Sequence, residues 1–340
     1  MQPSTHPRLA VPSFSDKDLA PLLTKGDGLV GKIGRAQKYL LELLKRLDGT
    51  TVTPERLAWV VIWSRSCQLL AAARTAFLDE NRFLISITFR GAAECYLHTQ
   101  FFVEPVLKLN ALAAAKSATV RVAPSAETRA KETMKDRLRG YAAWCLREDR
   151  KTLKTARGTL NDLYDGTDAQ ELMRDEQQRA FHEGLFGPIP TADQHELNRD
   201  RQTHAEYIEH RLAWLDSWLG SQHLAAWARQ LDDAERRNGP QSTSFFAALG
   251  AEGPSIRKRL KHLNIGFLYT TYSEASQMLH GSTVLNFLHI SDSQVTPHFG
   301  QASDEGSLTD GTSNYCLRAI GNLWYLRRHL WPEEGKEELS

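Results

Sequence analysis

Two sets of side chains at helical spacing are of the types that carry acid–base or phosphate chemistry. The first set, Arg90, Glu94 and His98, advances by four residues at a time through an otherwise apolar stretch. Such steps place side chains on one gently winding face of a helix. Because burying an unpaired charge is costly, charged groups on an apolar helix are paired or held for a task. The set therefore indicates either an ion pair that fixes the register of a helical bundle or a functional pocket.

The second set is Tyr272, Ser276 and His280, which also advances by four residues and ends beside Gly281, a typical helix stop. Histidine is the side chain best suited to proton transfer near neutral pH, and a helix C-terminus favours its cationic form. The alternative is a histidine that only caps the last turn. General acid–base chemistry becomes available if this set faces Arg90 and Glu94.

A basic strip precedes the second set. Between Ile256 and His262 the chain has four basic residues and no acid: Arg257, Lys258, Arg259 and Lys261. Such a strip suits RNA phosphates, whose contacts supply affinity rather than sequence choice. A solvated helix face is the alternative. Phe267, Tyr269 and Tyr272 follow, either to stack on bases or to join the core.

The sequence predicts neither a metal site nor a cofactor. Gly26 to Gly34 satisfies G-x-G-x-x-G, but the residues before it do not resemble the strand that a phosphate loop needs. Two groups of potential metal ligands lack a complete set at a known spacing: His204, Glu206, Glu209 and His210, and His289, Asp292 and His298. We therefore expect chemistry that uses side chains alone.

Helical periodicity dominates the chain and predicts an all-α fold. The expected helices cover about 29–48, 54–78, 82–103, 126–164, 193–219, 221–237, 265–279 and 315–330. Glu104-Pro105 is expected to close or kink the third helix, because proline disfavours helix in the residue before it. No window alternates convincingly as a strand, and a loop rich in Ser, Asp and Gly is expected over about 291–313.

These elements predict a bundle in which N-terminal and C-terminal helices pack together, with a charged helical insertion between them. The expected segments are a flexible arm over 1–25, a first half-bundle over 26–105, the insertion over 106–252, a second half-bundle over 253–332 and an acidic tail over 333–340. The charged helices between 126 and 237 are a candidate surface for a partner protein.

Composition limits the class of protein. The 340 residues contain 42 Lys+Arg and 41 Asp+Glu, a formal charge of +1, which excludes a histone-like binder but leaves a local phosphate site open. The four cysteines are widely spaced and read as reduced thiols, so we expect a cytoplasmic protein. No signal peptide is expected at the N-terminus. Residues 83–103 are apolar but contain three ionisable groups, so no membrane association is expected.

The Arg90-x-x-x-Glu94 helix, followed far downstream by Tyr272, Ser276 and His280, resembles an uncharacterised bacterial helical family of unknown function. That family is similar to the HEPN superfamily of helical bundles, many of which are metal-independent ribonucleases in toxin–antitoxin and anti-phage systems. The resemblance covers roughly 55–105 and 260–330. HEPN ribonucleases carry an arginine a few residues before the histidine on the same helix, whereas positions 273–275 here are Ser, Glu and Ala.

The resemblance implies a ribonuclease site in which Arg90 supplies the cation from the neighbouring helix. His280 would be the general acid or base, Glu94 would orient Arg90, and Tyr272 or Ser276 would hydrogen-bond phosphate. His98 and the basic strip would contact substrate. A cleft across a homodimer interface is one expected form of the site. A non-catalytic interaction module and a nucleotide or small-molecule sensor are the alternatives.

Overall fold

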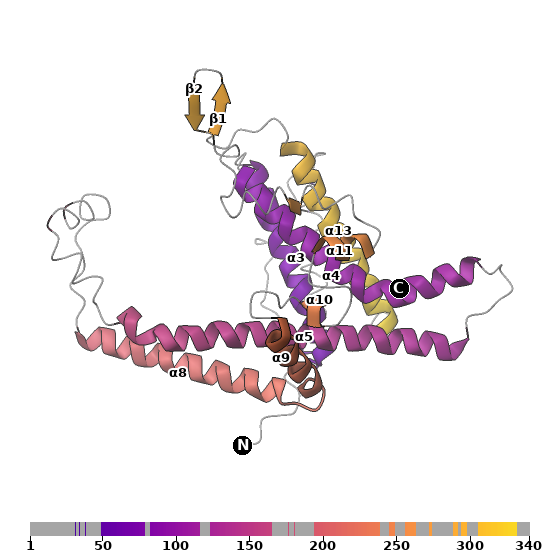
Figure 1. Cartoon of the computed structure of the whole chain (residues 1–340), viewed down its shortest axis with the longest axis horizontal. Helices are drawn as coiled ribbons and strands as arrows, with labels where there is room; N and C mark the ends of the chain where they lie inside the picture. Colours follow the sequence, from indigo (N-terminus) through magenta and orange to yellow (C-terminus); the bar gives the residue numbers. More distant parts are fainter. Residues whose placement is uncertain are drawn as a thin grey trace. The chain divides into compact units, whose positions relative to one another are not determined.

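The structure is a computed structural model of the chain. It describes residues 49–78, 82–115, 123–164, 194–238, 245–248, 256–262, 272–273, 288–291, 294–297 and 305–331, with 31, 34, 38, 176 and 180 described singly. Two compact units are formed, one by residues 1–139 with 234–340 and the other by residues 140–233. Figure 1 labels the helices and strands.

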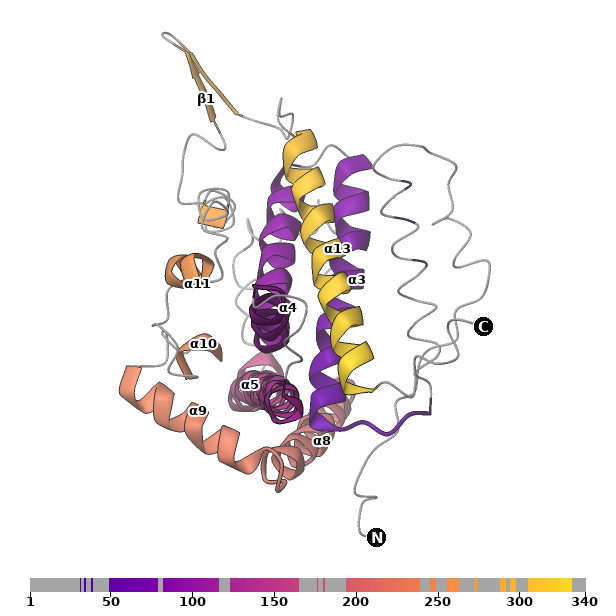
Figure 2. The same cartoon turned by 90° about the vertical axis from the view of Figure 1, so that its right-hand side faces the viewer.

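Three helices from the two ends of the chain form the bundle of the first unit. They are α3 (Pro54–Leu78), α4 (Arg82–Ala115) and α13 (Glu305–Leu330), and each packs against the other two. Figure 2 shows them side by side. The predicted all-α fold, with N-terminal helices packed on a C-terminal one, is confirmed.

The start of α3 follows from its sequence. The Thr53 hydroxyl accepts a hydrogen bond from the Arg56 amide at 3.3 Å, and Pro54 occupies the first turn, where its missing N–H costs nothing. Trp59 and Trp63, one turn apart, stack with ring centroids 4.6 Å apart and are fully buried. Because the Trp59 indole donates to the Leu323 carbonyl at 2.8 Å, α3 is tied to α13 without an unsatisfied polar group.

Of the two outcomes that the sequence predicts at Glu104-Pro105, the end is wrong, because α4 continues past it, whereas Figures 1 and 2 show that α4 does bend along its length. It runs to Ala115 with Pro105 inside it. A proline has no N–H to donate to the carbonyl four residues earlier. Here that carbonyl, on Phe101, accepts a hydrogen bond from the Arg137 guanidinium, which also pairs with Glu104 at 3.1 Å. A side chain from a distant helix thus replaces the lost backbone donor, which the local sequence does not reveal.

Glycines allow the bundle helices to approach closely at two points. A β-carbon on Gly91 would lie 2.6 Å from Cδ2 of Leu69, and one on Gly311 would lie 2.8 Å from a ring carbon of Phe89. The first glycine brings α4 against α3, and the second brings α13 against α4. Larger side chains at either position would force the helices or the contacting side chains to move.

The second unit contains α8 (Gln194–Leu219), the part of α5 (Pro124–Tyr164) from Gly140 onward, and the part of α9 (Ala225–Asn238) up to Asp233. Its helices are held together by a narrow row of apolar side chains and by ion pairs. Leu160 packs with Ile208 and Leu212 of α8. The Arg150–Asp216 and Arg157–Glu209 pairs, at 2.6 and 3.2 Å, join the same two helices. These helices are charged, as the sequence predicts.

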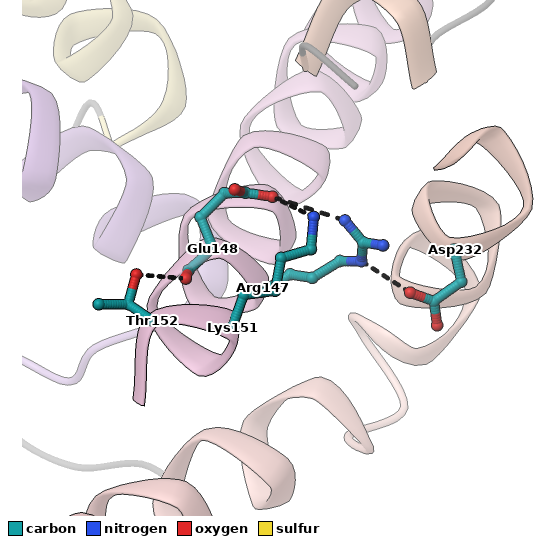
Figure 3. Close-up of polar contacts among 5 residues, drawn as sticks. All are labelled: Arg147, Glu148, Lys151, Thr152 and Asp232. Carbon is teal, nitrogen blue, oxygen red and sulfur yellow. Dashed lines mark hydrogen bonds and ion pairs between the residues drawn. The ribbon is translucent and has the colours of Figure 1, made fainter. Parts of the chain in front are cut away.

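Among the described residues of this unit, the most buried charged group is Arg147, whose side chain is 8% exposed. Its Nε donates to Asp232 of α9 at 2.7 Å, and its Nη1 lies 3.5 Å from Glu148, which also accepts from Lys151 at 3.0 Å (Figure 3). Two carboxylates thus face two cations. The arrangement neutralises Arg147, which explains how a charged group is accommodated there.

Shorter elements complete the described chain. They are α10 (Phe245–Ala248), α11 (Ile256–His262), β1 (Leu288–Ser291) and β2 (Gln294–Pro297). The two strands pair antiparallel, with Ile290 opposite Val295. The hairpin and the early start of α13 at Glu305 replace much of the loop predicted over 291–313. Buried Thr312 and Ser313 explain the early start, because polar residues are here held helical by tertiary packing. Within the described helices, none is long and apolar enough to cross a membrane.

Candidate functional site

Glu94 lies at the centre of a polar cluster in the first unit. Its Oε2 accepts from Nη2 of Arg65 on α3 at 2.9 Å, and its Oε1 accepts from Nε of Arg90 at 3.3 Å. The hydroxyl of Tyr272 donates to the same Oε1 at 3.1 Å. The Arg90 guanidinium carbon lies 5.6 Å from the centroid of the Tyr272 ring, in cation–π range. One carboxylate therefore holds two guanidinium groups and a phenol.

Helix geometry and the close contact at Gly91 position this cluster. Arg90 and Glu94 are one turn apart on α4, which brings their side chains together. Arg65 lies one turn before Leu69, the residue that contacts Gly91. Since Gly91 and Glu94 are three residues apart on α4, the close approach of the helices at Gly91 brings Arg65 within reach of Glu94.

The cluster brings two guanidinium groups to one carboxylate and is open to solvent. The side chains of Arg65, Arg90 and Glu94 are 37, 25 and 23% exposed. Burial alone would raise the pKa of Glu94, but the nearby charges of Arg65, His98 and Arg90 outweigh it and lower the pKa below its ordinary value. Glu94 is thus ionised at neutral pH, and two guanidinium groups share its charge. The arrangement suits an anion that approaches the arginines from solvent.

The phenol of Tyr272 remains protonated. Burial, followed by the charge of Glu94, raises the pKa of Tyr272 to about 12. A neutral phenol donates to Glu94 and contributes no charge of its own. Tyr272 therefore holds Glu94 in place in this structure, rather than offering its proton to a ligand.

The polar stripe predicted on α4 divides into two environments. Arg90 and Glu94 join the cluster, whereas the His98 ring is buried and stacks on Phe246 of α10 with centroids 5.0 Å apart. Phe101 packs on the Phe246 ring, with centroids 5.5 Å apart. An imidazole stacked among phenylalanines is not presented to a polymeric substrate. We therefore leave His98 out of the proposed site, although its charge contributes to the lowered pKa of Glu94.

The basic strip is placed on α11 and anchored to α4. Leu260 is buried against Tyr96 and Leu97, which lie two and three residues after Glu94 on α4. Three basic residues of the strip are exposed: Arg257, Lys258 and Lys261. Arg259 is helical, and its side chain lies outside the described residues. Leu97 follows Arg90 by seven residues, or two turns, and therefore lies on the same side of α4 as Arg90. The helix that carries the basic strip thus packs on that side of α4.

The described parts of the chain from α10 to Tyr272 contact α4 in reverse order. Phe246 contacts His98, Leu260 contacts Leu97, and Tyr272 contacts Glu94. Later residues of the segment thus meet earlier residues of α4. Tyr272 and Ser273 are helical, but Ser276 and His280 lie outside the described residues. The predicted meeting of Arg90 with His280 therefore stays a prediction.

Sequence reasoning missed Arg65. It lies in the apolar helix α3, nine residues along the chain from the nearest charged residues, Arg56 and Arg74. A signal was available, because a lone charge among Trp63, Cys67 and Leu70 invites the same question as Arg90. Its partner could not be identified, since Glu94 is 29 residues away.

Thiols do not supply a nucleophile in the bundle. All four cysteines are free. Burial raises the pKa of Cys67 to about 12 and that of Cys95 to about 11, and it raises that of Cys316 well above its usual range. Because the thiolate is the reactive form, these three protonated thiols are inert near neutral pH.

Within the part of the chain that the structure describes, no group of three His, Cys, Asp or Glu side chains is arranged to hold a metal ion. On α8, Glu206 accepts from Gln202 at 3.0 Å and Glu209 pairs with Arg157. The side chain of His289, and all of Asp292 and His298, lie outside the described residues.

No protein-family model, curated protein or solved structure matches the chain. The resemblance to HEPN proteins is thus neither supported nor contradicted by these comparisons. The cluster around Glu94 is the feature of the described chain that bears most directly on function.

Replacing Tyr272 with phenylalanine should lower the free energy of unfolding by about 1–2 kcal/mol, because Glu94 loses one of its donors in a half-buried site. Urea denaturation at pH 7 measures the change. The control is Tyr325→Phe, whose hydroxyl accepts from the exposed amide of Asn110 at 2.9 Å. That variant should lose about 0.5 kcal/mol or less. Equal losses would contradict the role given to Tyr272.

The raised pKa of Tyr272 adds a second readout. Its folded-state pKa of about 12 exceeds the ordinary value of 10, so the folded protein holds this proton more tightly than the unfolded chain does. The linked stability is present below pH 10 and is lost as the pH rises from 10 towards 12. In Tyr272→Phe this alkaline loss should be smaller.

Proposed function

We propose that the protein is a metal-independent, HEPN-like ribonuclease or related RNA-acting effector, with Arg90 as the cation that binds the reacting phosphate. The observation that supports this most is the Glu94 cluster, which fixes the orientation of Arg90 and brings a second guanidinium group, that of Arg65, to the same carboxylate. A fixed cation at a developing negative charge is worth far more than a mobile one, because it needs no reorganisation during the reaction.

In this proposal the chain supplies two chemical functions. A bond forms between the 2′-oxygen and phosphorus while the bond to the 5′-oxygen breaks. Either His280 takes the proton of the ribose 2′-hydroxyl and water protonates the leaving 5′-oxygen, or protonated His280 gives its proton to that oxygen and water takes the proton of the hydroxyl. Arg90 stabilises the negative charge of the phosphorane. Glu94 orients Arg90, and Tyr272 orients Glu94. Ser276 remains a candidate donor to phosphate.

The basic strip on α11 supports a polymeric substrate. Arg257, Lys258 and Lys261 are exposed on a helix that Leu260 anchors beside Leu97. Contacts between these side chains and phosphates would add affinity without sequence choice, and they would weaken as salt concentration rises. A substrate with several phosphates therefore fits this region better than a single nucleotide does.

The experiment is incubation of the purified full chain with total RNA and tRNA in EDTA. The parent should cleave RNA, and His280→Ala should reduce the rate by about 10²–10⁴-fold, the usual contribution of a general acid or base. The control is His223→Ala, at an exposed position in the turn before α9, which should keep the parent's rate. Intact RNA with the parent would refute the ribonuclease proposal, and so would equal rates for His280→Ala and the parent.

A non-catalytic interaction module remains the second candidate because of one feature of the charged helices. The helix α8 exposes the large aromatic side chains of Tyr207 and Trp214. Aromatic side chains of this kind often anchor protein interfaces.

A further inference from the structure

A line of aromatic and charged side chains follows one exposed flank of α8. Tyr207, Arg211, Trp214 and Trp218 are separated by four, three and four residues. Tyr207 is 52% exposed and Trp214 is 39% exposed. The same spacing extends backwards to His204 and Asp200, which are also exposed. We call these six residues the α8 seam.

The α8 seam is separate from the face that α8 uses inside its own unit. Ile208 and Leu212 are buried against Leu160 of α5, on a different side of the helix. The acids Glu209 and Asp216 are paired with arginines of α5. Most of the seam is thus an additional surface, although the charge of Arg211 acts on Asp149 of α5 and Trp218 is half-buried.

The aromatic side chains of the seam are already ordered in pairs. The Arg211 guanidinium lies 5.1 Å from the Tyr207 ring centroid and donates to the Tyr207 hydroxyl at 2.9 and 2.7 Å. The rings of Trp214 and Trp218 have centroids 5.7 Å apart. Because these groups are ordered beforehand, binding through them would cost less side-chain entropy.

We propose that the α8 seam binds the seam of a second copy of this chain, with the two helices antiparallel. Alternating steps of four and three residues are the spacing of helix–helix seams. In a symmetric antiparallel pair, each residue meets a different residue of the other copy. If Tyr207 meets Arg211 of the second copy, then His204 meets Trp214 and Asp200 meets Trp218. This follows because a step backwards along one antiparallel helix is a step forwards along the other, so the two residue numbers of each pair add to the same total.

The charges of the seam favour this arrangement over a parallel one. A parallel pair would place Arg211 against Arg211 and Asp200 against Asp200, and both contacts are repulsive. The antiparallel pair instead places Arg211 on the Tyr207 ring of the second copy, where cation–π attraction is available. It also places the indole N–H of Trp218 next to the Asp200 carboxylate, a matching donor and acceptor. The seam is therefore complementary to itself.

The test is the mass of the full-length protein in solution, measured by sedimentation velocity over a range of concentrations up to about 100 µM. The parent should form a dimer, and Trp214→Lys should raise its dissociation constant by about 30-fold or more, as for a residue central to an interface. The control is Trp324→Lys on α13, because Trp324 is 38% exposed and belongs to the other unit. That variant should dimerise like the parent.

The antiparallel register has its own test. Tyr207→Arg should weaken the dimer, because it places an arginine against Arg211 of the second copy. Adding Arg211→Tyr should restore it, because each arginine then faces a tyrosine again. Tyr207→Glu distinguishes the two directions. In an antiparallel pair it places a carboxylate against Arg211 of the second copy and should tighten the dimer, whereas in a parallel pair it places two glutamates against each other and should weaken the dimer. Circular dichroism of each variant shows that α8 and its unit are still folded.

Several results would overturn the proposal. They are a monomeric parent at every concentration, equal effects of Trp214→Lys and Trp324→Lys, and a double variant that dimerises no better than Tyr207→Arg. A Trp214→Lys variant that keeps its mass but binds single-stranded RNA more weakly would identify the seam as a base-stacking surface instead. RNA cleavage in EDTA is measured separately, so failure of the dimer is distinguishable from failure of the ribonuclease proposal.

Discussion

Replacing Glu94 with glutamine should lower the free energy of unfolding at pH 7 by about 2–3 kcal/mol. The substitution removes the negative charge that holds Arg65 and Arg90 together and leaves two guanidinium groups facing a neutral amide. Removing one partner of a fully buried ion pair costs about 3–5 kcal/mol, and the solvent exposure of this cluster reduces the expected loss. Urea denaturation followed by circular dichroism measures the change.

The matched control is Glu127→Gln. Glu127 pairs with Lys131 at 3.0 Å on the exposed surface of α5, and its side chain is 53% exposed. Exposed pairs of this spacing contribute about 0.3–0.5 kcal/mol, so the control should lose no more than that. If the two variants lost the same stability, Glu94 would be an ordinary surface acid.

The pH dependence of the Glu94 effect has a definite sign. The pKa of Glu94 in the folded protein is lower than its ordinary value of 4.5. The stability that its charge contributes is therefore present above about pH 4.5 and is lost as the pH falls through the folded pKa. The difference in stability between the parent and Glu94→Gln should be constant from pH 7 to pH 5 and should shrink at lower pH. A difference that grew under acid would contradict the lowered pKa.

Replacing Arg90 with alanine should reduce the rate of RNA cleavage in EDTA by about 10²–10³-fold, the usual cost of removing one oriented donor from a developing oxyanion. Arg90→Lys should recover only part of the rate. The planar guanidinium of Arg90 donates to Glu94 through Nε and keeps its other N–H donors for phosphate, whereas lysine has a single ammonium group that cannot do both in a fixed plane. The measurement is single-turnover cleavage of a short RNA.

Arg65→Ala serves as the comparison within the cluster. Arg65 holds the other oxygen of Glu94, Oε2, so its loss should affect the orientation of Glu94 more than the charge on the phosphate. We expect a smaller loss of rate, about tenfold. Arg201→Ala, at an exposed position on α8, should leave the rate unchanged. Equal rates for Arg90→Ala and Arg201→Ala would remove Arg90 from the site.

The sequence predicts the bundle well where signals are local. The start of α3 follows from Thr53 and Pro54, and the i,i+4 pairing of Arg90 with Glu94 follows from their spacing. The passage of α4 through Pro105 could not be predicted, because its compensation comes from Arg137, 36 residues from Phe101. The hydrogen bond from Arg137 stabilises the helix at a position where the local sequence favours an end or a kink.

The candidate site shows the same division. Spacing alone places Arg90 and Glu94 together, but it also groups His98 with them, although the structure stacks His98 on Phe246. The contact between Tyr272 and Glu94 spans 178 residues, and no local pattern predicts it, since the resemblance assigns the Tyr272 hydroxyl to phosphate. The partnership of Arg65 with Glu94 depends on close helix packing at Gly91, which periodicity does not show.

A double-mutant cycle on Arg90 and His280 tests the central claim most directly, because the claim requires both side chains to act on one phosphate. The rates of RNA cleavage in EDTA are compared for the parent, Arg90→Ala, His280→Ala and the variant with both changes. Groups that act as a unit are strongly non-additive, so the double variant should be no slower than the slower single variant, within about threefold. If the two losses instead multiplied, or if either single variant cleaved RNA at the parent's rate, Arg90 and His280 would not form one site.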